Sequence, residues 1–199
     1  MAEALQNANI PAPKTVIVHK DNIKKVLEIV KLPCVLKAPD STFSFGVKKA
    51  TTEKEYFALV KSMLGESALI IAQQFCPSTY DWRIGILDGE PFYACRYYMA
   101  KDHWQIYNWN AEKKADQDGN ADCMAIEDVP KYILETAVNT AKIMGQGLYG
   151  IDIKEVDGKP LVIEINDNPN IDAGVEDRFY GDKVYTRIIE ALINRIEDK

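Results

Sequence analysis

The chain has 199 residues and a net charge of −6, with 47% apolar and 27% charged residues, which is the composition of a globular protein. Its length fits one domain or two small ones. Lysine and arginine form no block longer than a pair, such as Lys24-Lys25. We therefore exclude the clustered basic surface that binds nucleic acid. No run approaches the roughly 18 apolar residues of a membrane span, so we expect no membrane partner.

The cysteines of the chain are widely spaced and form no Cys-x-x-Cys pair; they are Cys34, Cys76, Cys95 and Cys123. Three of them sit in apolar runs, where buried free thiols occur. We therefore expect reduced cysteines, no zinc site and a cytoplasmic location. The N-terminal residues include acids and amides instead of a basic region followed by an apolar stretch, which is not the pattern of a secretory signal.

The first part of the chain predicts a small unit of mixed helix and strand. Its expected strands lie at 14–19, 33–39, 47–51 and 68–75, and its expected helices at 21–31 and 52–64. The first helix carries apolar side chains three and four residues apart, and the second ends at Gly65. The intervening segment DSTFSFG, residues 40–46, is expected to be a loop.

The remainder predicts a second unit of the same kind. Its expected elements are strands at 82–87, 91–100 and 103–109, a mobile polar loop at 110–128, a helix from Pro130 to about Gly145, a hairpin over 150–166 and a last helix from about 182. Asp88-Gly89 predicts the turn between the first two strands, and Pro130 fits the first turn of its helix.

Together these elements predict an α+β fold with two subdomains, at 10–76 and 77–199, and a cleft between them. The last helix is expected to bury one side, because its apolar residues recur at helical spacing. The residues of that side are Val184, Ile188, Leu192 and Ile196.

The stretch 150–166, GIDIKEVDGKPLVIEIN, predicts a hairpin that turns at Asp157-Gly158. A two-residue loop there would place isoleucines on both faces and separate the acidic residues. A three-residue loop gathers the isoleucines on one face, because side chains alternate along a strand. Since a slip of one residue moves a whole strand's side chains to the other face, we predict the three-residue loop. Asp152, Glu164 and Asn166 then share the opposite face.

Two carboxylates and an amide oxygen on one sheet face indicate a bound cation, because the acids otherwise repel each other. Hard oxygen ligands in this number suit Mg²⁺, which keeps several waters and shares substrate phosphates. The alternative is an ordinary solvated sheet face. The following segment, NDNPNIDAGVED, favours the metal site, since it is too polar for a plain structural element.

Lys37 ends a predicted strand and precedes a Ser/Thr-containing loop that closes on Gly46. Such a lysine offers a point charge to a phosphate, and the loop offers backbone N–H donors. The chain has neither a Walker A loop nor a Gly-x-Gly-x-x-Gly motif. The alternative for Lys37 alone is a surface lysine. Beside a magnesium hairpin, it favours a nucleotide site.

These features resemble the ATP-grasp superfamily and, within it, the RimK-type carboxylate–amine ligases. The motifs that carry the resemblance follow the family's order: NIPAPKTVIV, PCVLKAPDSTFSFGV, LIIAQQF, DWRIGILDG, CRYY, HWQIYN, GLYGIDIKEVDG and VIEINDNPN. They span about residues 9–198. The resemblance implies an ATP-grasp fold, in which two α+β subdomains clasp ATP between them.

The resemblance also implies roles for individual residues. Lys37 matches the phosphate-binding lysine, and Arg96 falls near an arginine that holds the acyl-phosphate or the substrate carboxylate. The nucleotide contacts are implied at Gln74 and Phe75 for adenine, at Asp81 for the ribose, and at Asn108 for the phosphates. Asp152, Glu164 and Asn166 match the Mg²⁺ ligands, with Mn²⁺ as an alternative ion. For Asp81 the alternative is a surface ion pair with Arg83, and for Arg96 it is a half-exposed place in the sheet.

The implied reaction is ATP-dependent ligation. A substrate carboxylate attacks the γ-phosphate and gives an acyl-phosphate and ADP, and an amine then displaces phosphate. Amino acids or peptides are the implied substrates, with L-glutamate as one reactant. Family members also have an N-terminal domain, which we expect to be missing here. The alternative function is therefore a non-catalytic ATP-binding domain of a truncated or multi-part protein, and association into a homo-oligomer stays open.

Overall fold

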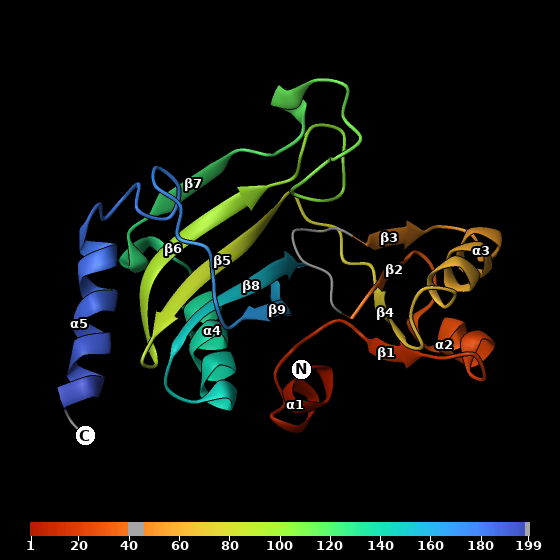
Figure 1. Cartoon of the computed structure of the whole chain (residues 1–199), viewed down its shortest axis with the longest axis horizontal. Coiled ribbons are helices and arrows are strands. Elements are labelled where there is room, and N and C mark those ends of the chain that lie inside the picture. Colours follow the sequence, from red (N-terminus) through yellow and green to blue (C-terminus); the bar gives the residue numbers. More distant parts are fainter. Residues whose placement is uncertain (40–45, 198–199) are drawn as a thin grey trace. The chain divides into compact units, whose positions relative to one another are not determined.

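We describe the chain from a computed structural model, in residues 1–39 and 46–197. Of the predicted loop at 40–46, all but Gly46 lies outside the described residues. The chain forms two compact units, one of Pro13–Pro77 and one of Met1–Ala12 with Ser78–Lys199 (Figure 1). Throughout the part that is described, every helix is too short or too polar to traverse a lipid bilayer.

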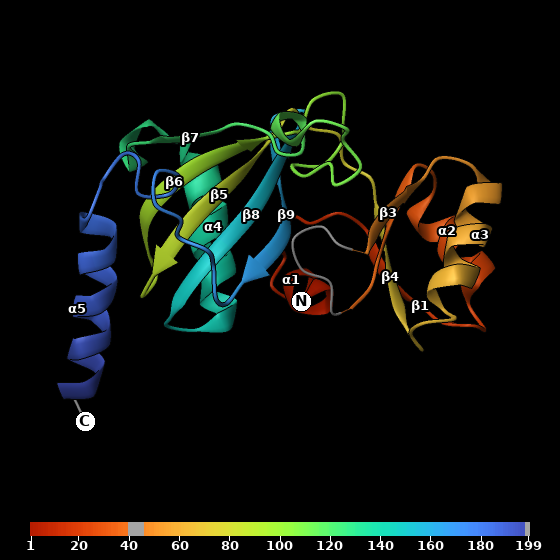
Figure 2. The same cartoon turned by 45° about the horizontal axis from the view of Figure 1, so that its top comes forward.

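The smaller unit is an antiparallel sheet with two helices on one face (Figure 2). Its strands are β1 (Thr15–Val18), β2 (Cys34–Lys37), β3 (Val47–Ala50) and β4 (Ile70–Gln74), in the spatial order β1-β4-β2-β3, and its helices are α2 (Ile23–Val30) and α3 (Glu53–Met63). A capping box starts α3, because the Thr52 side chain accepts from the Glu55 N–H while Glu55 reaches back to the Thr52 N–H. The buried Tyr56 hydroxyl donates to Ile23 O at 2.9 Å and joins the two helices.

The larger unit is a five-stranded antiparallel sheet with the spatial order β7-β6-β5-β8-β9. Its strands are β5 (Tyr80–Leu87), β6 (Glu90–Tyr98), β7 (Ala121–Met124), β8 (Leu148–Val156) and β9 (Lys159–Asn166). Its helices are α1 (Ala2–Asn7), α4 (Lys131–Met144) and α5 (Lys183–Glu197), with 3₁₀ turns at Lys114–Asp116 and Ile126–Asp128. Helix α4 packs against one face of the sheet, where buried Ile84, Ile133 and Ile151 belong to one core (Figure 1).

The hairpin of β8 and β9 corrects the predicted loop. Val156 pairs with Lys159, so the loop has two residues, and both Asp157 and Gly158 have positive φ, at 52° and 70°. Further along, Asp152 pairs with Glu164, because a β-bulge shifts the register between Asp152 and Ile153. In the sequence, a two-residue turn and a shared polar face were treated as incompatible. The structure contains both. The bulge reconciles them by adding one residue to β9.

Other elements also differ from the sequence predictions. The predicted strand at 103–109 is absent from the described structure except for an isolated bridge between Tyr107 and Asp118. Conversely, the segment expected to be a mobile loop contains β7, which pairs with β6. In the last helix Val184 is buried as predicted, but Leu192 and Ile196 are 50% and 74% exposed.

The cysteine prediction is wrong for one pair. Cys95 on β6 lies opposite Cys123 on β7, and the two form a disulfide with Cα atoms 4.1 Å apart. Cys34 and Cys76 lie outside this disulfide and are buried, as expected. The inference of a cytoplasmic location from reduced cysteines therefore loses part of its basis.

The two compact units and the predicted subdomains differ in one respect. Residues 1–12 belong to the larger unit, whereas the predicted smaller subdomain began at residue 10. Ile10 and Ala12 pack against the core of the larger unit, and Pro11 O accepts a hydrogen bond from Val162 N at 2.9 Å. The predicted functional subdomains at 10–76 and 77–199 stay a prediction.

Candidate functional site

The five-stranded sheet separates its side chains into an apolar face under α4 and a polar face on the other side. The alternation along β5 and β8 puts Trp82, Ile84, Ile151 and Ile153 into the core with α4. The intervening residues, including Asp81, Arg83, Asp152 and Lys154, therefore lie on the opposite face, which we call the polar face. Glu164 and Asn166 of β9 join it, because they pair with Asp152 and Gly150.

An ion pair between Arg83 and Asp152 lies at the centre of the polar face. The two residues are cross-strand partners, and Arg83 binds the carboxylate with both Nε and Nη2; the Nη2–Oδ2 distance is 2.9 Å. Both side chains are largely buried, at 18% and 16% exposed. Burial lowers the pKa of Arg83, but the attraction to Asp152 outweighs this effect and raises it above its ordinary value. The guanidinium, which also lies 5.4 Å from the Tyr97 ring centre, stays charged.

The three predicted metal ligands come together on this face. The Asn166 amide Nδ2 lies 3.2 Å from both Gly150 O and Asp152 Oδ2, and Glu164 faces Asp152 across the β8–β9 pair. Both oxygens of Asp152, however, already accept hydrogen bonds from Arg83. A cation would therefore share Asp152 with the guanidinium or replace it.

The donor set of the polar face fits a hard divalent ion in part. Within residues 1–39 and 46–197, no three His, Cys, Asp or Glu side chains are grouped so that they could hold a metal. The predicted protein ligands are two carboxylates and an amide oxygen. Such a set suits Mg²⁺, which completes its shell with waters and phosphate oxygens. Asp152, Glu164 and Asn166 would hold the ion.

Asp81 is held by two neighbours on the polar face. Its Oδ1 accepts hydrogen bonds from Ser78 Oγ at 3.0 Å and from Lys154 Nζ at 2.5 Å. Lys154 Nζ also lies 2.6 Å from Ser78 Oγ, so the three side chains form a closed triangle. Burial raises the pKa of the Asp81 carboxyl, and the Lys154 ammonium opposes this shift. The sequence alternative of an ion pair with Arg83 is wrong, because Arg83 pairs with Asp152.

Arg96 does not join these residues. It is the cross-strand partner of Trp82, on the face that α4 covers, and it binds Asp122 with Nε–Oδ1 at 3.0 Å and Nη2–Oδ2 at 2.6 Å. Its guanidinium lies 5.3 Å from the ring centre of Tyr80. The predicted catalytic role of Arg96 stays untested, but the arginine that reaches the polar face is Arg83.

Asn108 lies in the long connection between β6 and β7. Its backbone N–H donates to Gln117 O at 2.7 Å, and its side-chain oxygen accepts from the backbone N–H of Asn110 at 3.2 Å. Beside it, the rings of Tyr107 and Trp109 stack at a centroid distance of 5.3 Å. These contacts shape the connection, and the predicted contact of Asn108 with phosphates stays a prediction.

Three predicted nucleotide residues belong to the smaller unit. Lys37 is the last residue of β2, while Gln74 ends β4 and Phe75 follows it. The backbone N–H of Gln74 donates to Lys14 O at 2.8 Å, and Lys49 Nζ lies 4.6 Å from the Phe75 ring centre. Gln74 and Phe75 also line a pocket of about 290 Å³ within this unit, to which Lys14 and Lys31 contribute their positive charge.

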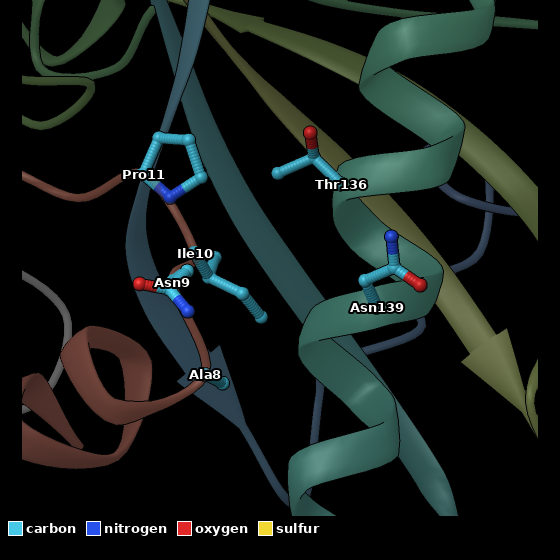
Figure 3. A pocket seen from close by; sticks show the side chains of 6 residues that line it. All are labelled: Ala8, Asn9, Ile10, Pro11, Thr136 and Asn139. Atoms are coloured by element: carbon cyan, nitrogen blue, oxygen red, sulfur yellow. The ribbon is translucent and has the colours of Figure 1, made fainter.

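A cavity of about 330 Å³ in the larger unit is lined by none of the predicted site residues (Figure 3). It is lined by Ala8, Asn9, Ile10, Pro11, Thr136 and Asn139, from the chain after α1 and from α4. None of these side chains carries a charge or a nucleophile suited to phosphate chemistry, and the cavity contributes nothing to the candidate site.

Sequence reasoning missed a buried acid beside the polar face. Glu176, which is 1% exposed, accepts hydrogen bonds from the Tyr97 hydroxyl and from the backbone N–H of Asp172, the latter at 2.8 Å. Burial and this bond to Glu176 raise the pKa of Tyr97, so its hydroxyl keeps the proton that it donates. The signal was present in the polar segment after β9, but only the fold brings that segment against Tyr97 of β6.

Comparison with known proteins places these features in a family. Residues 5–173 match the family model described as D-ala D-ala ligase C-terminus. Curated relatives include a "Probable alpha-L-glutamate ligase" of Psychromonas ingrahamii, 29% identical over 178 residues that cover 87% of this chain and 55% of the relative. A protein of Methanococcoides burtonii with the same description is 28% identical, with 87% and 56% covered. The chain thus spans about half the length of these relatives.

Solved structures show the same architecture. The D-alanine–D-alanine ligase of Bacillus anthracis superimposes with a TM-score of 0.76 at 18% identity, covering 100% of this chain and 67% of that one. A RimK-domain ATP-grasp protein of Sphaerobacter thermophilus gives a TM-score of 0.59 at 17% identity, with 85% and 57% covered. The predicted α+β class and ATP-grasp fold are confirmed. The chain therefore belongs to the family of D-Ala–D-Ala ligase C-terminal domains and has the ATP-grasp fold.

Proposed function

We propose that the chain is the catalytic part of an ATP- and Mg²⁺-dependent carboxylate–amine ligase that works through an acyl-phosphate. The observation that carries the proposal is the polar face, where Arg83, Asp152, Glu164 and Asn166 converge on one sheet of an ATP-grasp domain. The family match and the relatives described as probable α-L-glutamate ligases support L-glutamate as one reactant. Other amino acids or peptides are the further substrates to test.

The reaction balances as two transfers. A substrate carboxylate oxygen forms a bond to the γ-phosphorus and ADP leaves; the amine nitrogen then bonds to the acyl carbon, and phosphate leaves as the amine loses a proton. Positioning and charge neutralisation are the main tasks of a protein in phosphoryl transfer. A bound Mg²⁺, or Mn²⁺ in its place, would supply charge neutralisation at the phosphate oxygens.

The residues of the chain have separate tasks in this scheme. Arg83 is a largely buried cation of the polar face and offsets negative charge there. Asp81 accepts from the ribose, while Lys37 contacts the phosphates and Gln74 and Phe75 contact the adenine. Asn108 as a phosphate contact and Arg96 as a catalytic residue remain part of the proposal.

The relatives extend beyond the matched region, and one structural neighbour bears the description of an ATP-grasp ligase complexed with Mg and ADP. We propose that a further domain, which the resemblance places before this region, completes the substrate site. Cytoplasmic location and self-association are parts of the proposal that need their own measurements.

The second candidate function is nucleotide binding without ligation. The position of Arg96 favours it, because the arginine predicted to hold the acyl-phosphate is paired with Asp122 on the face under α4. ADP release that depends on added L-glutamate and an amine supports the ligase. ATP binding without any such release supports the second function.

The first experiment is calorimetric titration of ATP with and without Mg²⁺. Glu164→Gln removes a charge from the polar face and is expected to weaken the Mg²⁺-dependent binding about tenfold or more. The matched control is Glu155→Gln on the same hairpin, because Glu155 points to the α4 side and accepts from the Tyr132 hydroxyl at 2.9 Å. Binding that ignores both Mg²⁺ and Glu164→Gln contradicts the metal assignment.

A further inference from the structure

The triangle of Ser78, Asp81 and Lys154 uses only one oxygen of the Asp81 carboxylate. Oδ1 of Asp81 accepts from both Ser78 Oγ and Lys154 Nζ, whereas no residue in the described part of the chain donates to Oδ2. The Asp81 side chain is only 14% exposed. Oδ2 is not one of the fully buried side-chain atoms that lack a partner in the described residues, which are Trp82 Nε1 and Tyr93 Oη. It is therefore accessible from outside and can accept a hydrogen bond from a ligand or from water.

The ammonium group of Lys154 is also held in place by its contacts. Its side chain is 13% exposed, and its ammonium contacts both other members of the triangle, at 2.5 and 2.6 Å. The charge of an unpaired lysine would be mobile. Here the two short contacts, to Ser78 and Asp81, fix the position of the ammonium group. Together with Ser78 it fixes the carboxylate plane of Asp81 and so the direction of Oδ2.

The position of the triangle on the sheet limits the kind of ligand. Asp81 is two residues before Arg83, the cross-strand partner of Asp152. Strand geometry separates two residues along a strand by ~6.6 Å and adjacent strands by ~4.8 Å, so Asp81 lies roughly 8 Å from Asp152. That separation matches the distance between a sugar and the phosphates that it carries. An ionised carboxylate is a strong acceptor for sugar hydroxyls.

We propose that Lys154 and Ser78 are positioning residues that aim Asp81 Oδ2 at a ribose hydroxyl and thereby select ribonucleotides over deoxyribonucleotides. This inference rests on the proposed nucleotide binding, and it assigns a task to Lys154 and Ser78 that neither the resemblance nor the comparisons give them. Neither residue touches the nucleotide; both act through Asp81.

The test is calorimetric titration of ATP, 2′-deoxy-ATP and 3′-deoxy-ATP in the presence of Mg²⁺. A hydrogen bond to a charged acceptor implies that the chain binds ATP about tenfold or more tightly than the deoxynucleotide lacking the contacted hydroxyl. In Lys154→Met this ratio falls to about threefold or less, while the affinity for that deoxynucleotide changes little. Lys154→Arg keeps charge and donors and is expected to retain most of the ratio, and Ser78→Ala to lose part of it.

The matched control is Lys159→Met, which removes an exposed lysine at the turn of the same hairpin and should leave the ratio unchanged. Thermal melting identifies a variant that fails to fold, in which case Ser78→Ala and Lys154→Arg carry the test. Equal binding of ATP and both deoxynucleotides by the unmodified chain overturns this inference but leaves the proposed function intact. So does a ratio that Lys154→Met does not change. Absence of ATP binding in every form refutes the proposed function itself.

Discussion

The guanidinium of Arg83 binds both carboxylate oxygens of Asp152 across neighbouring strands, with 2.9 Å between Nη2 and Oδ2. A metal ion would seek the same two oxygens. Arg83 therefore neutralises the Asp152 carboxylate when no metal ion is bound. Its guanidinium also occupies the oxygens that a metal ion would need. This relationship gives the first prediction.

Arg83→Met should destabilise the chain by about 3 kcal/mol, because it leaves a largely buried carboxylate without its partner. Urea unfolding at pH 7 measures the change. The control is Arg187→Met: Arg187 pairs with Glu90 at 2.9 Å, but the two side chains are 44% and 77% exposed, so the loss should stay below about 1 kcal/mol. Equal losses in the two variants would show that the Arg83 pair has no special weight.

The same pair predicts an effect on metal binding. Without Arg83, both oxygens of Asp152 become available to a cation. Arg83→Met should therefore bind Mn²⁺ more tightly than the unmodified chain in the absence of nucleotide, as measured by electron paramagnetic resonance. Arg83→Met/Asp152→Asn should lose this gain. Weaker Mn²⁺ binding by Arg83→Met would mean that arginine and metal do not compete.

Gly150 provides the space in which Arg83 lies. A Cβ at this position would meet the Pro169 Cβ at 2.8 Å and the Arg83 Cδ at 3.1 Å. Gly150→Ala should therefore displace Arg83 and Pro169, destabilise the chain by roughly 1–3 kcal/mol and weaken ATP binding. Thermal melting and calorimetry report the two effects. Unchanged ATP affinity would separate the position of Arg83 from nucleotide binding.

Gly158 in the hairpin turn gives the contrasting case. Apart from the two chain neighbours, no heavy atom of the described residues lies within 4 Å of a Cβ at this position, but its φ of +70° is unfavourable for a side chain. Gly158→Ala should cost about 1–2 kcal/mol of stability through the backbone alone. ATP affinity should stay unchanged, since the bulge lies between the turn and the pair of Asp152 and Glu164. Gly158→Asn is the control and should cost less, because asparagine tolerates this conformation.

Stability should fall at alkaline pH because of Cys34. Burial raises the pKa of this fully buried thiol from about 9 to about 11. The unfolded chain releases the proton above pH 9 while the folded chain retains it, so stability is full below pH 9 and declines as the pH rises to 11. The decline from this group should be about 3 kcal/mol. Urea unfolding at pH 8 and pH 11 should show a smaller decline for Cys34→Ala.

The sequence predicted the elements whose hydrophobic pattern is strong and local. The helix of residues 131–144 and the alternating strands β5 and β8 have apolar periodicities that fix their buried faces, and all three elements are confirmed. The polar face followed from that alternation, because a buried isoleucine on one side dictates the neighbour on the other. The strands and helices of the smaller unit were likewise predicted, and each is present close to its predicted bounds.

The sequence predictions fail where the formation of an element depends on a partner that is distant in the chain. β7 has no apolar alternation and forms because β6 offers it an unpaired edge. The segment 103–109 has the alternation, but within the described residues it pairs only through the isolated bridge at Tyr107. The register of the strand pairing was also needed to tell which arginine lies on the polar face. Arg83 and Arg96 look equivalent in sequence, but the cross-strand partner of Arg83 is Cys95 and that of Arg96 is Trp82, so they face opposite sides.

The bulge in β9 has a consequence for how this hairpin tolerates change during evolution. It lies between the turn at Asp157-Gly158 and the pair of Asp152 and Glu164. Insertions or deletions on the turn side can be absorbed there, while the pairing of the two carboxylates beyond it is preserved. A one-residue change in β8 between Gly150 and Asp152 has no such buffer and would exchange the apolar and polar faces. Length variation among homologous sequences should therefore gather at the turn and spare the segment from Gly150 to Asp152.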